Sequence, residues 1–126
     1  MKDKIILGIQ IVVGLMLVVF GANGFLQFMP MPEHSKEMGD WLQAVYMTVY
    51  IFPLIAFIEI VAGLAFLSNK LVALMAIIVM PVVLNATLAH IFLNDIGGVG
   101  MALFLTISIA LIMIGKKEAY RAIFKA

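Results

Sequence analysis

Four long runs of apolar residues, separated by polar segments, dominate the pattern along the chain. They cover residues 5–29, 50–67, 71–93 and 99–114. A helix needs about 20 mostly apolar residues to cross a hydrocarbon layer about 30 Å thick, and the runs are close to or above that length. The last three runs follow one another through very short links, which favours antiparallel neighbours. We therefore predict an all-α fold, an integral membrane four-helix bundle that forms a single domain over residues 1–126.

The segment between the first two runs has a different pattern. From Met38 to Val49, apolar residues recur at helical spacing, and the charged residues that precede and accompany them fall mostly between the apolar positions. This pattern is typical of an amphipathic helix that lies at a membrane interface. We predict such a helix over about residues 34–48. Residues 115–126, after the fourth run, are predicted to form a basic tail that follows the fourth span.

Composition supports lipid as the solvent of these helices. Hydrophobic residues make up 65% of the 126 residues and charged residues 12%. Soluble domains average about 45–50% apolar and about 25% charged residues. A soluble fold of this size leaves too much of its surface exposed to hide so many apolar side chains. The lipid bilayer is therefore the first partner that the sequence predicts.

The distribution of basic residues predicts the orientation of the four spans. With four spans, both termini and the link at 68–70 share one side of the membrane. The other side carries only Lys36 among the basic residues, whereas the first side carries Lys2, Lys4, Lys70, Lys116, Lys117, Arg121 and Lys125. Cytoplasmic loops hold the excess of Lys and Arg. We therefore expect a multi-pass protein of the cytoplasmic (inner) membrane with its N- and C-termini in the cytoplasm.

Several classes of chemistry find no support in the residues. The chain has no cysteine, which excludes thiol chemistry, and its two histidines, His34 and His90, are predicted to lie on different elements without the context of metal ligands. No glycine-rich phosphate loop follows a strand. The net charge of +1 offers no field that would attract nucleic acid. We expect no metal site and no nucleic-acid partner.

A few polar residues interrupt the apolar runs and are the candidates for function. They are Asn23 and Gln27 in the first run, Glu59 in the second, and Asn85 and His90 in the third. At about 1.5 Å per residue, most of them fall between the membrane midplane and its outer surface. Ionisable groups inside a span cost roughly 2.5–3.5 kcal/mol, so Glu59 is expected to be protonated or paired. We predict a shared outward-half pocket in which all five bind a ligand.

Within this pocket, Glu59 and His90 are the predicted catalytic residues. A protonated carboxylic acid donates a hydrogen bond to a carbonyl oxygen, and an imidazole moves a proton near neutral pH. The alternative is purely structural. Polar side chains also form hydrogen bonds between membrane helices and fix how those helices pack.

Three pairs of segments resemble a known family. They are Gly21–Phe25 with Phe28–Pro32, Tyr50–Ile55 with Ile58–Leu64, and Pro81–Asn85 with His90–Leu93. Through them nearly the whole chain is similar to the DoxX and DoxX-like family of small four-span bacterial membrane proteins. The resemblance implies a four-helix membrane bundle. It also implies a redox association, since members are linked to thiosulfate:quinone oxidoreductase and to membrane complexes that handle oxidative or quinone stress.

The leading functional hypothesis is a membrane subunit of an electron-transfer system that binds a quinone-like or other small apolar partner. No side chain here carries an electron, so the redox centre would be a bound cofactor, with quinone the candidate, or a partner protein. The chain would then be a component of a quinone-linked oxidoreductase and not a complete enzyme. Two alternatives stay open: an anchor or scaffold for a soluble oxidoreductase, and a carrier of small molecules or lipids. A homo-oligomer is also left open.

Overall fold

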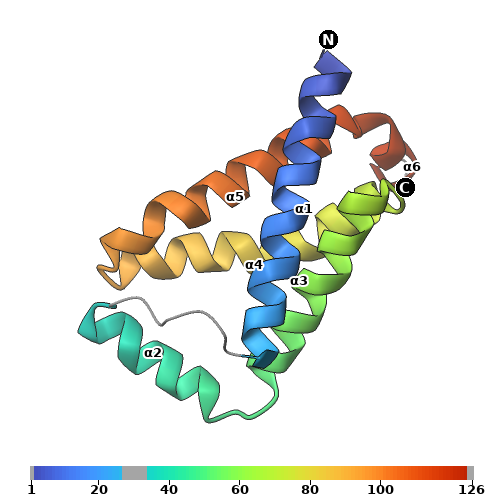
Figure 1. The fold of residues 1–126 in the computed structure, drawn as a ribbon. Helices are drawn as coiled ribbons and strands as arrows, with labels where there is room; N and C mark the ends of the chain where they lie inside the picture. Colours follow the sequence, from blue (N-terminus) through green and yellow to red (C-terminus); the bar gives the residue numbers. More distant parts are fainter. Residues whose placement is uncertain (1, 27–33, 125–126) are drawn as a thin grey trace.

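The described part of the chain is entirely helical. The structure is a computed structural model that describes residues 2–26 and 34–124, and no strand occurs within them. Its helices are α1 (Lys2–Leu26), α2 (Lys36–Tyr46), α3 (Ile51–Ser68), α4 (Val72–Phe92), α5 (Ile96–Gly115), the 3-10 helix η1 (Lys117–Tyr120) and α6 (Arg121–Phe124) (Figure 1). By length and composition, four of these helices, α1, α3, α4 and α5, could cross a membrane.

The four predicted apolar runs are therefore confirmed as helices, with small shifts at their ends. Residues 27–29 of the first predicted run lie outside the described residues. The fourth helix begins at Ile96, three residues earlier than predicted, because Gly97 and Gly98 belong to its first turn and do not end the preceding helix. Pro53 lies in the first turn of α3, where its missing N–H has no helical partner to lose.

The long helices are arranged as two pairs. α1 packs along α3, α4 packs along α5, and the pairs meet through α3–α4 and α1–α5 contacts (Figure 1). Small residues bring the backbones of α1 and α3 close together. A β-carbon on Gly14 would lie 3.0 Å from the Gly63 carbonyl oxygen, and one on Gly21 would lie 2.8 Å from that of Ala56. Such positions allow close helix approach in membrane proteins.

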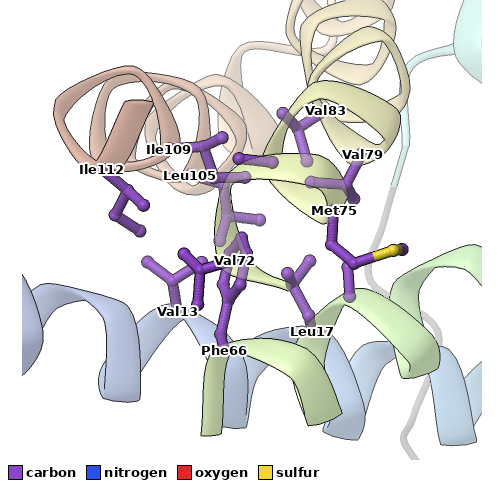
Figure 2. Packing of buried hydrophobic residues seen from close by; sticks show 12 residues of the cluster. Val13, Leu17, Phe66, Val72, Met75, Val79, Val83, Leu105, Ile109 and Ile112 are labelled. Atoms are coloured by element: carbon purple, nitrogen blue, oxygen red, sulfur yellow. The ribbon is translucent and has the colours of Figure 1, made fainter. Parts of the chain in front are cut away.

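The apolar core joins the two pairs at one end of the bundle. We call this the terminal end, because Asp3, the turn at Asn69 and Lys116 lie there, and we call the opposite end, which carries α2 and the turn at Asp95, the loop end. Side chains from α1 and α3 point toward those of α4 and α5 (Figure 2). The core consists of Val13, Leu17, Ala62, Phe66, Val72, Met75, Ala76, Val79, Val83, Leu105, Ile109 and Ile112.

Toward the loop end, the interior becomes poorer in large apolar side chains. The buried residues of the long helices there are small or polar, namely Ala56, Thr87 and Ala102. Thr87 and Thr106 join α4 to α5 through a hydrogen bond of 2.8 Å between their hydroxyl oxygens, and each hydroxyl also lies within hydrogen-bond distance of a carbonyl of its own helix. The polar candidates of the sequence therefore fall in the half of the bundle that the main core does not fill.

The outer surface of the four long helices is apolar. The protein interior buries between 22% and 33% of the residues in each apolar window, and many Leu, Ile, Val and Phe side chains on these helices are exposed. Burying so little apolar surface would leave a water-soluble bundle strongly unstable. This distribution is that of helices whose flanks face lipid.

α2 connects the loop ends of the two pairs. Its N-cap is Ser35, whose hydroxyl accepts a hydrogen bond of 3.1 Å from the Met38 N–H. The same hydroxyl donates to the Leu93 carbonyl at the end of α4. Met38 is the buried residue of α2, and the helix then leads through residues 47–50 to the start of α3 (Figure 1). A helix was predicted over about residues 34–48, and the structure gives one over Lys36–Tyr46.

The tail turns away from the direction of α5. α5 ends at Gly115, and Lys116 leaves the helical conformation with φ −107° and ψ 20°. The chain then turns back through η1, and the Tyr120 hydroxyl donates a hydrogen bond of 2.7 Å to the Ala73 carbonyl in the first turn of α4. This hydrogen bond and the burial of the Tyr120 ring hold the tail against the bundle.

Candidate functional site at the loop end

Glu59 lies on the side of α3 that faces the rest of the bundle. Three residues before it is Ala56, which is 2% exposed, and three residues after it is Ala62, which is fully buried. Residues three apart share a helix face. Glu59 itself is half-buried. Its carboxyl group makes no hydrogen bond or ion pair with the described residues. Every fully buried side-chain oxygen or nitrogen among those residues has a partner, so the carboxyl group of Glu59 is not fully buried. The carboxyl group is therefore inward-facing but still reachable.

His90 is engaged elsewhere, at the junction of α4 and α5. Its Nδ1 lies 2.7 Å from Oδ2 of Asp95, and Nδ1 of His34 lies 3.0 Å from the same oxygen. The Ser35 N–H donates to the other oxygen, Oδ1, at 3.0 Å. Asp95 is 5% exposed. We call these four residues the Asp95 cluster. It fastens the segment before α2 to the turn between α4 and α5.

Local sequence builds this cluster from the turn outward. Asn94 takes a left-handed conformation with φ 58°, which asparagine tolerates better than most residues. The turn places the Asp95 N–H 2.8 Å from the His90 carbonyl, so Asp95 comes back alongside the residue that it binds. The His90 ring then occupies the space that a β-carbon on Gly98 would need. The second glycine of the turn therefore serves the packing of an imidazole.

The electrostatics of the cluster keep Asp95 ionised. Burial raises the pKa of Asp95, but hydrogen bonds from His34, the Ser35 N–H and His90, together with the charge of His34, outweigh it and hold the pKa below its ordinary value. A carboxylate only accepts hydrogen bonds, so both imidazoles must donate from Nδ1. In the neutral form of either ring, Nε2 is then a proton acceptor. An acidic residue that orients an imidazole in this way can support proton transfer.

A metal site does not follow from this arrangement. Both Nδ1 atoms are directed at one carboxylate oxygen. Residues 2–26 and 34–124 contain no group of three or more His, Asp or Glu side chains placed to hold a metal ion. The cluster is a hydrogen-bonded junction with proton-accepting nitrogens.

Three predicted residues remain, Asn85, Asn23 and Gln27. Asn85 is exposed on α4 and makes no hydrogen bond with the described residues, and Asn23 is half-buried on α1. Gln27 lies outside the described residues. Within the described part of the chain, no hydrogen bond links Glu59 to Asn85 or His90. The roles predicted for these residues stay predictions, but the geometry separates Glu59 from the Asp95 cluster as two candidate sites.

Sequence reasoning missed the contribution of His34, Ser35 and Asp95. One signal was available, since His90 and Asp95 stand five residues apart on either side of a turn. For His34 there was none, because nothing in the local pattern shows where a loop residue docks, 61 positions from its partner in sequence.

Two cavities lie at the opposite, terminal end. One of about 420 Å³ is lined by the start of α4 and the folded-back tail, including Tyr120. The other cavity, of about 360 Å³, lies at the start of α1 and the end of α5, and its lining residues include Gln10 and Lys116. Neither is lined by Glu59 or by the Asp95 cluster. A molecule bound in either of these cavities would therefore not contact Glu59.

No protein-family model, no curated protein and no solved structure matches the chain. The resemblance to the DoxX family is accordingly still a prediction.

Proposed function

We propose that the chain is a multi-pass inner-membrane protein with four antiparallel spans, with α2 at the outer interface and both termini in the cytoplasm. Charge supports this orientation. Among the described side chains, the loop end carries one cation, Lys36. The terminal end carries Lys4, Lys70, Lys116, Lys117 and Arg121. Trp41 and Tyr46 on α2 suit the aromatic belt of an interface. The exposed apolar flanks of the long helices would face lipid.

Within this placement, the proposed function is that of a membrane subunit of a redox system that binds a quinone-like or other small apolar ligand at Glu59. One observation carries the proposal. Glu59 lies on the bundle-facing side of α3, half-buried, with no hydrogen-bond partner among the described residues. A carboxyl group in hydrocarbon is strongly stabilised by any hydrogen-bond partner. A ligand carbonyl would supply one.

The residues around Glu59 fit a small apolar ligand better than a polar one. Ala56 and Ala62 lie one turn away on the same face of α3, and Ile58 and Ile60 are the sequence neighbours of Glu59, so its surroundings on the helix are apolar. Protonated Glu59 would donate to the ligand oxygen and orient its ring. A bound quinone would supply the electron-carrying chemistry that the side chains lack. The Asp95 cluster adds proton acceptors toward the outer surface.

The test is ligand binding by the full-length protein in mild detergent. A short-chain benzoquinone analogue is titrated into the wild type and Glu59→Gln, with binding measured by equilibrium dialysis. We expect Glu59→Gln to weaken binding roughly three- to tenfold, because an amide N–H is a weaker hydrogen-bond donor than a carboxylic acid O–H. Glu37→Gln, the same change at an exposed site on α2, is the matched control and should bind as the wild type does. Equal binding by Glu59→Gln would remove Glu59 from the site.

A second candidate is a scaffold for a soluble oxidoreductase. It is favoured by the exposed charges of α2, which present Lys36, Glu37 and Asp40 away from the helices that hold it. Two variants distinguish the two functions. For a scaffold, reversing these three charges abolishes co-purification of a pigmented partner from native membranes, and Glu59→Gln leaves it intact. For a ligand-binding subunit, Glu59→Gln weakens binding of the benzoquinone analogue, and reversing the three charges leaves that binding intact.

A further inference from the structure

α4 presents an exposed stripe with heptad spacing on the side away from the core. Its residues are separated by alternating steps of four and three, the spacing of a helix–helix seam. All of them are exposed, and they are Leu74, Ile78, Pro81, Asn85, Leu88 and Phe92. The core residues of α4, such as Val79 and Val83, lie on the other side of the helix. We call this surface the α4 stripe.

Asn85 is the one polar residue of the α4 stripe. Its amide carries two N–H donors and one acceptor oxygen. None of them has a hydrogen-bond partner among the described residues, although Asn85 lies near the middle of the 21-residue helix α4. Acyl chains offer no partner either, so an amide at this depth is left unsatisfied when the face is covered by lipid.

We propose that a second copy of this chain covers the α4 stripe, with the two Asn85 side chains hydrogen-bonded to each other across a two-fold axis. An asparagine amide is self-complementary, since each copy donates to the oxygen of the other. The rest of the stripe is uncharged and apolar, so it requires an uncharged, apolar partner that offers an amide at the same depth. A second copy of the stripe meets both conditions.

The membrane fixes the geometry of this dimer. Two copies inserted with the same orientation are related by an axis along the membrane normal, so the two α4 helices run parallel. A lone asparagine at one position of an apolar heptad seam specifies register and the number of helices in parallel assemblies. Polar side chains also hold membrane helices together. The inference rests on the membrane placement proposed above and is independent of ligand binding at Glu59.

Cysteine cross-linking tests the interface directly, because the natural chain contains no cysteine. Leu88→Cys places a thiol one turn from Asn85 on the stripe. Leu103→Cys on α5 is the matched control: the side chains are 42% and 41% exposed, and each lies seven or eight positions from Asp95. In native membranes treated with a mild oxidant, we expect disulfide-linked dimers from Leu88→Cys and none from Leu103→Cys. Equal cross-linking of both, or of neither, would overturn the proposal.

The role of Asn85 is tested by diluting fluorescently labelled full-length protein in vesicles and following energy transfer between copies. We expect Asn85→Leu to raise the dissociation constant roughly three- to thirtyfold, the range given by interhelical polar contacts in membranes. Since Leu suits a lipid-facing position, this variant should fold normally. Asn85→Gln keeps the amide and should restore most of the association. Wild-type association by Asn85→Leu would overturn the proposal.

The same samples separate this proposal from the proposed function. Leu88→Cys, which changes the α4 stripe and keeps Asn85, should bind the benzoquinone analogue as the wild type does, and Glu59→Gln should dimerise normally. A monomeric wild type that still binds the analogue would reject the dimer alone. A dimer that fails to bind would reject the ligand site alone.

Discussion

The imidazole of His90 lies against Gly98, in the space that a side chain at position 98 would fill. This contact lets the ring reach Asp95 across the turn between α4 and α5. Gly98→Ala should therefore push His90 away from Asp95 and cost about 1–3 kcal/mol of stability, the usual range for overpacking. Thermal unfolding in mild detergent measures this loss.

Two neighbouring glycines of the same helix control for the change in helix propensity. A β-carbon on Gly97 or Gly100 would meet nothing within 4 Å. Gly97→Ala and Gly100→Ala should leave stability unchanged or raise it slightly, because alanine favours a helix over glycine. If all three variants lose stability equally, the contact between His90 and Gly98 is not what makes glycine necessary.

Asp95 should hold the segment before α2 in place. Asp95→Asn replaces one carboxylate oxygen with an NH₂ group, which cannot accept a hydrogen bond. His34 and His90 then compete for the one amide oxygen that is left. We expect a loss of about 1–3 kcal/mol, as for buried hydrogen bonds to a charged group. Amide exchange of the segment at Ser35 should quicken in parallel. Asp40→Asn, on an exposed part of α2, should change neither quantity.

The same carboxylate predicts a dependence on pH. Because the pKa of Asp95 is lowered in the folded protein, its contribution to stability is complete above the ordinary value of 3.8 and is lost as the pH falls below it. The stability difference between the wild type and Asp95→Asn should thus stay constant at neutral pH and shrink below about pH 4. Unfolding curves over this range check the sign. A difference that grows with acidification would contradict it.

The close approach of α1 to α3 should depend on Gly63. A β-carbon there would lie 2.7 Å from the Gly14 carbonyl oxygen and 2.6 Å from Cγ2 of Val18. Gly63→Ala should force the helices apart and cost about 1–3 kcal/mol. Gly8→Ala on α1, where a β-carbon meets nothing within 4 Å, should cost nothing in the same unfolding measurement.

The sequence predicted the helices well because length and hydrophobicity are local properties. A run of about 20 apolar residues has few alternatives to a spanning helix, and the period of α2 was visible between Met38 and Tyr46. Depth in the membrane, however, is only one coordinate. It placed Glu59, Asn85 and His90 in one layer but said nothing about which way each faces around its helix. The structure turns Glu59 inward and Asn85 outward, and it directs His90 to Asp95.

Nonlocal contacts explain the other differences. Gln10, in the first apolar run, is 1% exposed and donates to the Phe66 carbonyl and to Asn69 Oδ1 at 2.8 and 2.9 Å. That position is favourable because the last carbonyls of α3 have no helical partner. Only the register between α1 and α3 brings Gln10 to them, and the register follows from small residues whose partners the sequence does not reveal.

The folded-back tail should depend on the Tyr120 hydroxyl. Tyr120→Phe removes the 2.7 Å hydrogen bond to Ala73 and keeps the buried ring, so we expect the tail to loosen by about 0.5–1.5 kcal/mol while the four long helices stay intact. Protease cleavage between Lys116 and Lys117 should quicken in this variant and remain unchanged in Tyr46→Phe, whose ring is 67% exposed. Burial raises the pKa of Tyr120 above its ordinary value of 10.0. The docking is therefore complete below pH 10 and weakens above it as the phenol ionises, so cleavage of the wild type should approach that of Tyr120→Phe only in that alkaline range.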